Sequence, residues 1–163
     1  MKARVYVGMG SNMDRTCNIR SGVNALRGQF GELTLSRVYD SAAVGFNGAN
    51  FFNLVAGFDS AQSVQKIVTA LQRIEAEHGR KREEKRFAPR PLDLDLLLYD
   101  NLVLNKGKIH IPRDEILKYA FVLCPLAEIA PQQIHPVTGR SFLQLWRAFD
   151  DTGQQLSPVD LRL

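Results

Sequence analysis

The sequence is poor in cysteine and has no long apolar run. Only two of its 163 residues are cysteines. Cys17 and Cys124 lie far apart and form neither a CxxC pair nor a zinc-ligand spacing, which excludes a disulfide-rich secreted domain and a structural zinc site. No stretch approaches the ~20 apolar residues of a membrane helix, and Met1–Gly8 is too polar for a secretory signal. We therefore expect a cytoplasmic protein that does not bind a membrane.

Two common glycine-rich nucleotide motifs are also missing. Gly8 and Gly10 begin like a dinucleotide-binding fingerprint, but Met13 stands where the third Gly or Ala would be. The phosphate-loop pattern GxxxxGK[ST] does not occur. These absences exclude a Rossmann dehydrogenase and a Walker-type kinase.

The positive charge is concentrated in one short segment. The chain has a formal net charge of +4, and the segment Arg80–Arg90 alone carries six basic and two acidic residues. The rest of the chain is therefore balanced. A confined basic patch indicates a small anionic ligand rather than an extended nucleic-acid surface.

The length and the hydrophobic spacing predict one α+β domain. At roughly 150 residues per domain, we expect residues 1–163 to form a single domain, with 151–163 as a loosely held polar tail. Apolar spacing predicts strands over 4–8, 33–39, 53–58 and 92–99, and helices over 14–28, 63–78 and 142–149. The order strand, helix, strand, strand, helix, strand is typical of a ferredoxin-like split βαβ arrangement, a mostly antiparallel sheet flanked by helices.

The chemistry is concentrated in the predicted strand that follows the basic segment. Alternation puts Leu92, Leu94, Leu96 and Leu98 on the core face and two carboxylates, Asp93 and Asp95, on the other. Neighbouring carboxylates repel unless a cation lies between them, and Mg²⁺ prefers such ligands together with phosphate oxygens. The two aspartates could instead lie on the solvent side of an edge strand. The adjacent basic residues favour a site for Mg-nucleotide phosphoryl transfer.

The segment Arg86–Leu97 resembles the signature of the 6-hydroxymethyl-7,8-dihydropterin pyrophosphokinase (HPPK) family. Further matching segments are residues 10–12, 44–45, 52–53, 72–75, 79–80 and 125–131. The resemblance implies an enzyme of folate biosynthesis that transfers pyrophosphate from ATP to the pterin hydroxymethyl group and releases AMP. It also implies that ATP and the pterin are its small-molecule partners. We expect a monomer that binds no nucleic acid.

The resemblance also implies the roles of individual residues. Asp93 and Asp95 would bind two Mg²⁺ ions. We expect no strong general base, and Asp95 could accept the proton of the metal-activated hydroxyl. The phosphates would meet arginines from a segment, Gly79–Pro91, that we expect to be mobile before it closes over substrates. These catalytic arginines are Arg80, Arg82 and Arg90. The resemblance places Glu75, Arg82 and Arg90 on the nucleotide side, and we expect Lys108 and Arg113 to join them there.

The pterin side is implied in the same way. Phe51 and Phe121 would sandwich the ring, and Asn53 would hydrogen-bond its polar edge. Backbone groups from Ser41 to Val44 would bind the remaining edge. Without the resemblance, both phenylalanines would be interpreted as core residues and Asn53 as a turn residue.

The chain departs from the family pattern on the nucleotide side. Arg113 and Asp114 stand where the family often has His and Tyr, and Tyr119 replaces a later Arg. Arg113 would supply positive charge at every pH, whereas Asp114 is unexpected beside an anion. A paralogue with another nucleotide or pterin therefore stays open. A ferredoxin-like RNA-binding module is disfavoured, because no aromatic RNP strand is present.

Overall fold

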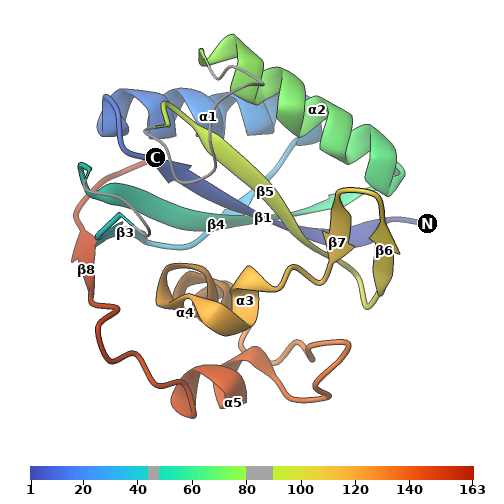
Figure 1. Ribbon diagram of the computed structural model, residues 1–163. Helices are drawn as coiled ribbons and strands as arrows, with labels where there is room; N and C mark the ends of the chain where they lie inside the picture. The colour runs from blue at the N-terminus through green and yellow to red at the C-terminus, as the bar shows by residue number, and fades with distance from the viewer. Residues whose placement is uncertain (44–47, 80–89) are drawn as a thin grey trace.

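The computed structural model describes residues 1–43, 48–79 and 90–163. An antiparallel sheet forms its centre, with strand order β5-β1-β4-β3-β8 and with β2 paired to β4 (Figure 1). A separate hairpin consists of β6 and β7. The elements are β1 (Ala3–Ser11), α1 (Arg15–Phe30), β2 (Thr34–Leu35), β3 (Val38–Ser41), β4 (Phe51–Ser60), α2 (Val64–Glu77), β5 (Asp93–Tyr99), β6 (Leu104–Lys106), β7 (Ile109–Ile111), α3 (Glu115–Lys118), α4 (Ala120–Ile129), α5 (Phe142–Arg147) and β8 (Leu156–Val159).

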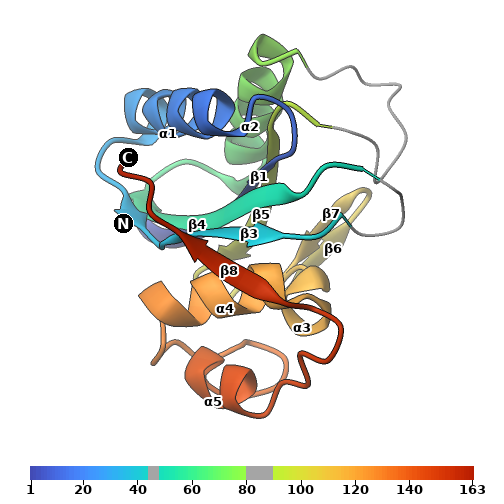
Figure 2. The ribbon, with the colours of Figure 1, turned by 90° about the vertical axis from the view of Figure 1, so that its left-hand side faces the viewer.

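The predicted ferredoxin-like arrangement is confirmed. One βαβ unit consists of β1, α1 and β3, and the second consists of β4, α2 and β5. The two units interleave, so that β1 lies between β5 and β4, and the pairings are antiparallel. Helices α1 and α2 cover one face of the sheet, while α3, α4 and α5 lie on the other (Figure 2). None of the described helices combines the length and the apolar content of a bilayer span.

Alternation along the strands supplies a hydrophobic core on each face. Val7, Met9 and Leu94 pack with the buried stripe of α1 and α2. Tyr6, Val55 and Leu97 pack with the buried residues of α4. A fully buried aliphatic side chain stabilises the fold by about 1.5–3 kcal/mol. A sheet that is buried on both faces therefore holds the side chains at the ends of its strands in fixed positions.

Two strands differ from the prediction in ways that matter for the faces of the sheet. The expected strand over 33–39 is interrupted at Ser36, whose Oγ accepts a hydrogen bond of 2.9 Å from the Val55 N–H. The register between β1 and β5 shifts by one residue at Leu97: Tyr6 pairs with Leu98, and the next residue, Val7, pairs with Leu96. This β-bulge moves Leu98 to the α4 face, so the prediction that it shares the face of Leu92, Leu94 and Leu96 is wrong.

The chain beyond Asp150 differs from the predicted loosely held tail. Strand β8 pairs with β3, with Val38 opposite Val159 and Ser41 opposite Leu156 (Figure 2). Leu161 and Leu163 then pack against the core on the α1 and α2 side. The local composition is polar, yet the segment forms a strand. Without β8, the backbone hydrogen-bonding groups on one edge of β3 would be unpaired.

Candidate active site

Two neighbouring hollows lie at one end of the sheet. The small pocket, about 180 Å³, is lined by the ends of β1, β3, β4 and β5 and by α4. The large cavity, about 1250 Å³, is lined by α2, β5 and the β6–β7 hairpin. Arg90, Asp95 and Arg113 line both hollows. A ligand in either hollow therefore lies beside the same carboxylate and the same two guanidinium groups.

The two carboxylates lie over glycines of the neighbouring strand. Asp93 pairs with Gly10 and Asp95 with Gly8, and all four positions lie on the face of β1 and β5 that lines the small pocket. A Cβ atom at Gly10 would lie 2.9 Å from the Asn53 Oδ1. Glycine at this position therefore leaves the floor of the pocket open between Asp93 and Asn53.

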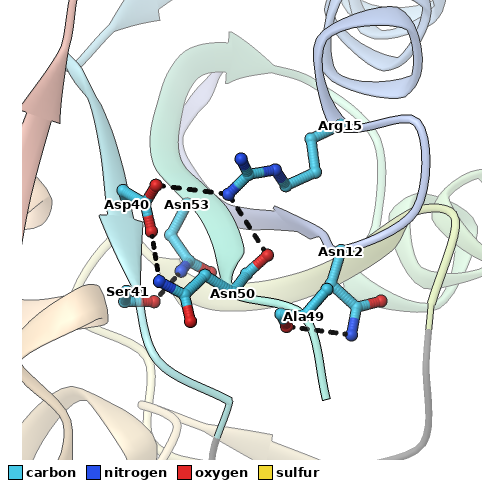
Figure 3. A network of polar contacts seen from close by, with 7 residues as sticks. All are labelled: Asn12, Arg15, Asp40, Ser41, Ala49, Asn50 and Asn53. Carbon is cyan, nitrogen blue, oxygen red and sulfur yellow. Dashed lines mark hydrogen bonds and ion pairs between the residues drawn. The ribbon is translucent and has the colours of Figure 1, made fainter.

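The residues predicted to bind a pterin come together in the small pocket. Ser41, Phe51, Asn53 and Phe121 all line it, from β3, β4 and α4. The Asn53 Nδ2 donates a 2.6 Å hydrogen bond to the Ser41 Oγ, which orients the buried amide (Figure 3). Phe121 stacks on Tyr119 with ring centroids 5.1 Å apart. The pocket thus offers aromatic faces and an oriented amide to a flat polar ring.

Arg113 lies between the two hollows. Its Nη2 lies 3.8 Å from the Asp95 Oδ1, and its Nε lies 2.5 Å from the Glu115 Oε2. Burial alone would lower the pKa of the guanidinium, but the charges of Asp95 and Glu115 outweigh burial and raise that pKa above its ordinary value. Arg113 is therefore positively charged at any working pH.

The other two unusual positions are separated from the large cavity. Asp114 is exposed at the N-terminus of α3, where the adjoining backbone N–H groups favour a negative charge. Tyr119 lines the small pocket, on the side of Phe121. Neither departure from the family pattern adds negative charge to the lining of the large cavity.

The predicted nucleotide residues Glu75 and Lys108 line the large cavity. Glu75 is buried near the end of α2, and its Oε2 accepts a 2.9 Å hydrogen bond from the Leu94 N–H, between the two aspartates. Lys108 lies in the turn between β6 and β7. Lys106, Arg73 and His110 line the same cavity, so much of its lining is basic. Such a lining suits a polyphosphate.

Three predicted site residues lie outside the described residues. These are Val44, Arg80 and Arg82. The expected mobility of Gly79–Pro91 concerns a segment of which 80–89 also lie outside that range. Their roles stay predictions.

The donor set fits Mg²⁺. Among the described residues, no group of three or more His, Cys, Asp or Glu side chains is arranged to enclose a metal ion. Asp93 and Asp95 both line the small pocket from one face of β5, and Asp95 also lines the large cavity. Mg²⁺ keeps several waters and is held by one or two carboxylates together with substrate phosphates. Two carboxylates beside a basic cavity therefore form the kind of site that binds Mg²⁺ together with a phosphate.

Comparison with known proteins agrees with this geometry. The family model described as 7,8-dihydro-6-hydroxymethylpterin-pyrophosphokinase (HPPK) matches residues 6–131. The chain belongs to the HPPK family. A 2-amino-4-hydroxy-6-hydroxymethyldihydropteridine pyrophosphokinase of Aquifex aeolicus is 37% identical over 138 residues, which cover 83% of this chain and 85% of that protein. The protein of the same name from Pseudomonas aeruginosa is 34% identical over 165 residues, which cover 97% of this chain and 99% of that protein.

Solved structures support the HPPK fold. An HPPK-DHPS crystallised with substrates superposes with a TM-score of 0.74 at 10% identity and covers 94% of this chain. The wild-type HPPK-DHPS of Plasmodium falciparum with pteroate gives the same TM-score and covers 90%. This chain spans 44% and 42% of those two longer chains. The likeness therefore concerns the HPPK fold.

Some residues of this HPPK site were missed by sequence reasoning. The predicted strand over 4–8 ends before Gly10, yet β1 continues through Ser11. An isolated glycine within a strand pattern signals a close approach, and that signal could have identified the pocket floor. Glu115 lines the small pocket and pairs with Arg113. Its partner is only two residues away, but the place of this pair in the pocket depends on a distant contact, because the Arg113 N–H donates to the Leu97 carbonyl oxygen at 3.1 Å.

Proposed function

We propose that this HPPK-family protein transfers pyrophosphate from ATP to the hydroxymethyl group of 6-hydroxymethyl-7,8-dihydropterin. The hydroxymethyl oxygen attacks the β-phosphorus of ATP, the bond from that phosphorus to the α-phosphate oxygen breaks, and AMP leaves. The hydroxyl proton passes to Asp95 or to water. The reaction is a step of folate biosynthesis.

One observation carries the proposal. The small pocket and the large cavity share Arg90, Asp95 and Arg113. A pterin in the small pocket and a triphosphate in the large cavity would therefore meet beside one carboxylate and two cations. Bringing acceptor and donor together in this way supplies much of the catalysis in phosphoryl transfer, where positioning and charge stabilisation dominate.

The positions of the side chains support the role that we propose for each. Asn53, held by Ser41, hydrogen-bonds the pterin edge, and Phe51 and Phe121 contact the faces of its ring. Arg90 and Arg113 bind phosphate oxygens at the junction of the hollows, and Lys108 binds them within the large cavity. Roles for Val44, Arg80 and Arg82 are carried over from the family signature alone.

Glu75 has a supporting role as well as a place beside the nucleotide. Its hydrogen bond to the Leu94 N–H holds the outer edge of β5 between the two aspartates. We propose that Asp93 and Asp95 hold two Mg²⁺ ions. When bound, the ions would neutralise phosphate charge and lower the pKa of the acceptor hydroxyl. The aspartates themselves orient that chemistry, because both project to one face of β5.

The test is a product assay. The protein is incubated with ATP, Mg²⁺ and 6-hydroxymethyl-7,8-dihydropterin, and AMP is resolved from ADP. We expect AMP and a pterin diphosphate in equal amounts. ADP as the product would contradict the proposed transfer, and so would the absence of any nucleotide product.

A paralogue with another phosphate donor is the second candidate, and Arg113 is the observation that favours it. A permanent cation at the junction changes the contacts offered to a nucleotide. This candidate predicts that the pterin binds, measured by its fluorescence, while ATP yields no AMP and another nucleoside triphosphate yields its monophosphate.

We further propose that the protein acts in the cytoplasm. We also propose that it acts as a single-domain monomer, since one chain lines both hollows.

A further inference from the structure

The turn between β1 and α1 makes several polar contacts with segments that enter the site. Asn12 follows the last residue of β1 and is 6% exposed. Figure 3 shows its side chain directed at Ala49, just ahead of β4, while Arg15, the first residue of α1, reaches Asp40 and Asn50. A buried amide in this position is stable only when its donor and acceptor groups are satisfied.

Asn12 makes two reciprocal hydrogen bonds with the backbone of Arg90. The Asn12 N–H donates to the Arg90 carbonyl oxygen at 3.0 Å, and the Arg90 N–H donates to the Asn12 Oδ1 at 2.6 Å. The second bond depends on the side chain. Arg90 is itself 6% exposed and lines both hollows. The side chain of Asn12 therefore restrains the backbone from which a shared guanidinium extends.

The contact of Asn12 with the pterin side is weaker and is duplicated. Its Nδ2 donates to the Ala49 carbonyl oxygen at 3.4 Å. The next residue, Asn50, is held independently, because the Arg15 Nη1 lies 3.3 Å from both the Asn50 carbonyl oxygen and the Asp40 Oδ2. The Arg15 guanidinium also lies 3.9 Å from the centre of the Phe52 ring. Loss of Asn12 should therefore disturb Arg90 more than it disturbs the start of β4.

We infer that Asn12 is a positioning residue for Arg90, so that its side-chain oxygen acts on the rate of the reaction rather than on binding of the pterin. The inference rests on the proposed function, in which Arg90 binds the reacting phosphates. Displacement of a catalytic group by about 1 Å can lower a rate by about a hundredfold. The oxygen of Asn12 fixes the position of the Arg90 backbone, and Asn12 itself lines neither hollow.

Two variants separate the donor of Asn12 from its acceptor. Asn12→Asp keeps an oxygen for the Arg90 N–H and loses the donor to Ala49, whereas Asn12→Ala loses both. We expect Asn12→Ala to lower kcat by at least about tenfold and Asn12→Asp to keep kcat within about threefold. The dissociation constant of the pterin should change by less than about threefold in both, because Arg15 still holds Asn50.

A matched control lies in the same part of the chain. The Asn18 side chain donates to the Met13 carbonyl oxygen and is partly exposed, so Asn18→Ala removes an asparagine contact with no link to Arg90. It should keep wild-type kcat. Unchanged kcat in Asn12→Ala would overturn the inference. Equal losses of kcat in Asn12→Ala and Asn12→Asp, or an equal loss of pterin affinity, would do so as well.

An activity-independent measurement separates this inference from the proposed function. In the wild-type protein the Arg90 amide should exchange with deuterium slowly, Asn12→Asp should preserve that protection, and Asn12→Ala should lose it. Rapid exchange of this amide in the wild type would overturn the inference even if neither variant folds. If the wild type makes no AMP, the proposed function fails, while amide exchange still decides whether Asn12 holds Arg90.

Discussion

Substitution of Gly10 by alanine is the sharpest test of the pocket geometry. The added methyl group would lie 2.9 Å from the Asn53 Oδ1 and 3.5 Å from the Phe51 Cδ1. Carbon contacts are comfortable at about 3.5–4.0 Å, so the Asn53 oxygen must retreat by roughly 0.5 Å. Asn53 cannot do so freely, because its amide is buried and hydrogen-bonded to Ser41 at 2.6 Å.

The size of the effect follows from the hydrogen bonds at stake. Displacing Asn53 weakens its bond to Ser41 and its bond to the pterin edge, each worth about 1 kcal/mol. Only the bond to the pterin enters the binding equilibrium, and a loss of about 1 kcal/mol corresponds to roughly fivefold weaker pterin binding. The weaker bond to Ser41 lowers the free energy of unfolding instead. Gly10 has an ordinary strand backbone, and alanine in a strand recovers about 0.5–1 kcal/mol of chain entropy. The free energy of unfolding should therefore change little.

The assay is a fluorescence titration of the pterin, together with a thermal melt of each variant. Gly8→Ala is the matched control, since it adds the same methyl group to the same face of β1, and its nearest neighbour is Leu97 Cδ1 at 3.5 Å. We expect Gly8→Ala to bind the pterin within about twofold of wild type. Wild-type pterin affinity in a folded Gly10→Ala variant would refute the reasoning that the open floor beside Asn53 forms the pterin site.

Three further predictions concern charge. Asp95→Asn should abolish turnover while the melting temperature is kept, because the carboxylate binds metal at the junction of the hollows; normal turnover would contradict this role. Arg113→Gln should weaken binding of a non-hydrolysable ATP analogue in calorimetry by about tenfold to a hundredfold, the value of a charged hydrogen bond, and unchanged affinity would remove Arg113 from the nucleotide site. Burial lowers the pKa of His135 below 6.5, and its Nδ1 accepts hydrogen bonds from Val137 and Thr138. The unfolded chain then takes up the proton first, so the free energy of unfolding should fall as the pH drops below 6.5, and an NMR titration midpoint at or above 6.5 would be inconsistent with this account.

Local patterns were sufficient for much of the fold and for the pair of carboxylates. The apolar spacing of Ile67, Leu71 and Ile74 predicts α2, and the structure buries all three. Alternation places Asp93 and Asp95 on one face of β5, and the pairing with β1 agrees. These features depend on residues close in sequence, so the period of the side chains carries them. The resemblance to the HPPK family added the predicted pterin contacts, since Phe51 and Phe121 would otherwise be assigned to the core and Asn53 to a turn.

The sequence by itself determined the interleaved βαβ plan, the pair of carboxylates and the concentration of basic charge beside them. Only the tertiary structure decided how these parts meet. The bulge at Leu97, the pairing of β8 with β3 and the hydrogen bond from the Arg90 N–H to the Asn12 side chain each join residues far apart in the chain. So does the junction at Arg113, which lies against Asp95 after a hairpin has intervened. Such contacts depend on the global packing of the sheet and helices, and a periodic pattern read along one segment carries no information about its distant partner.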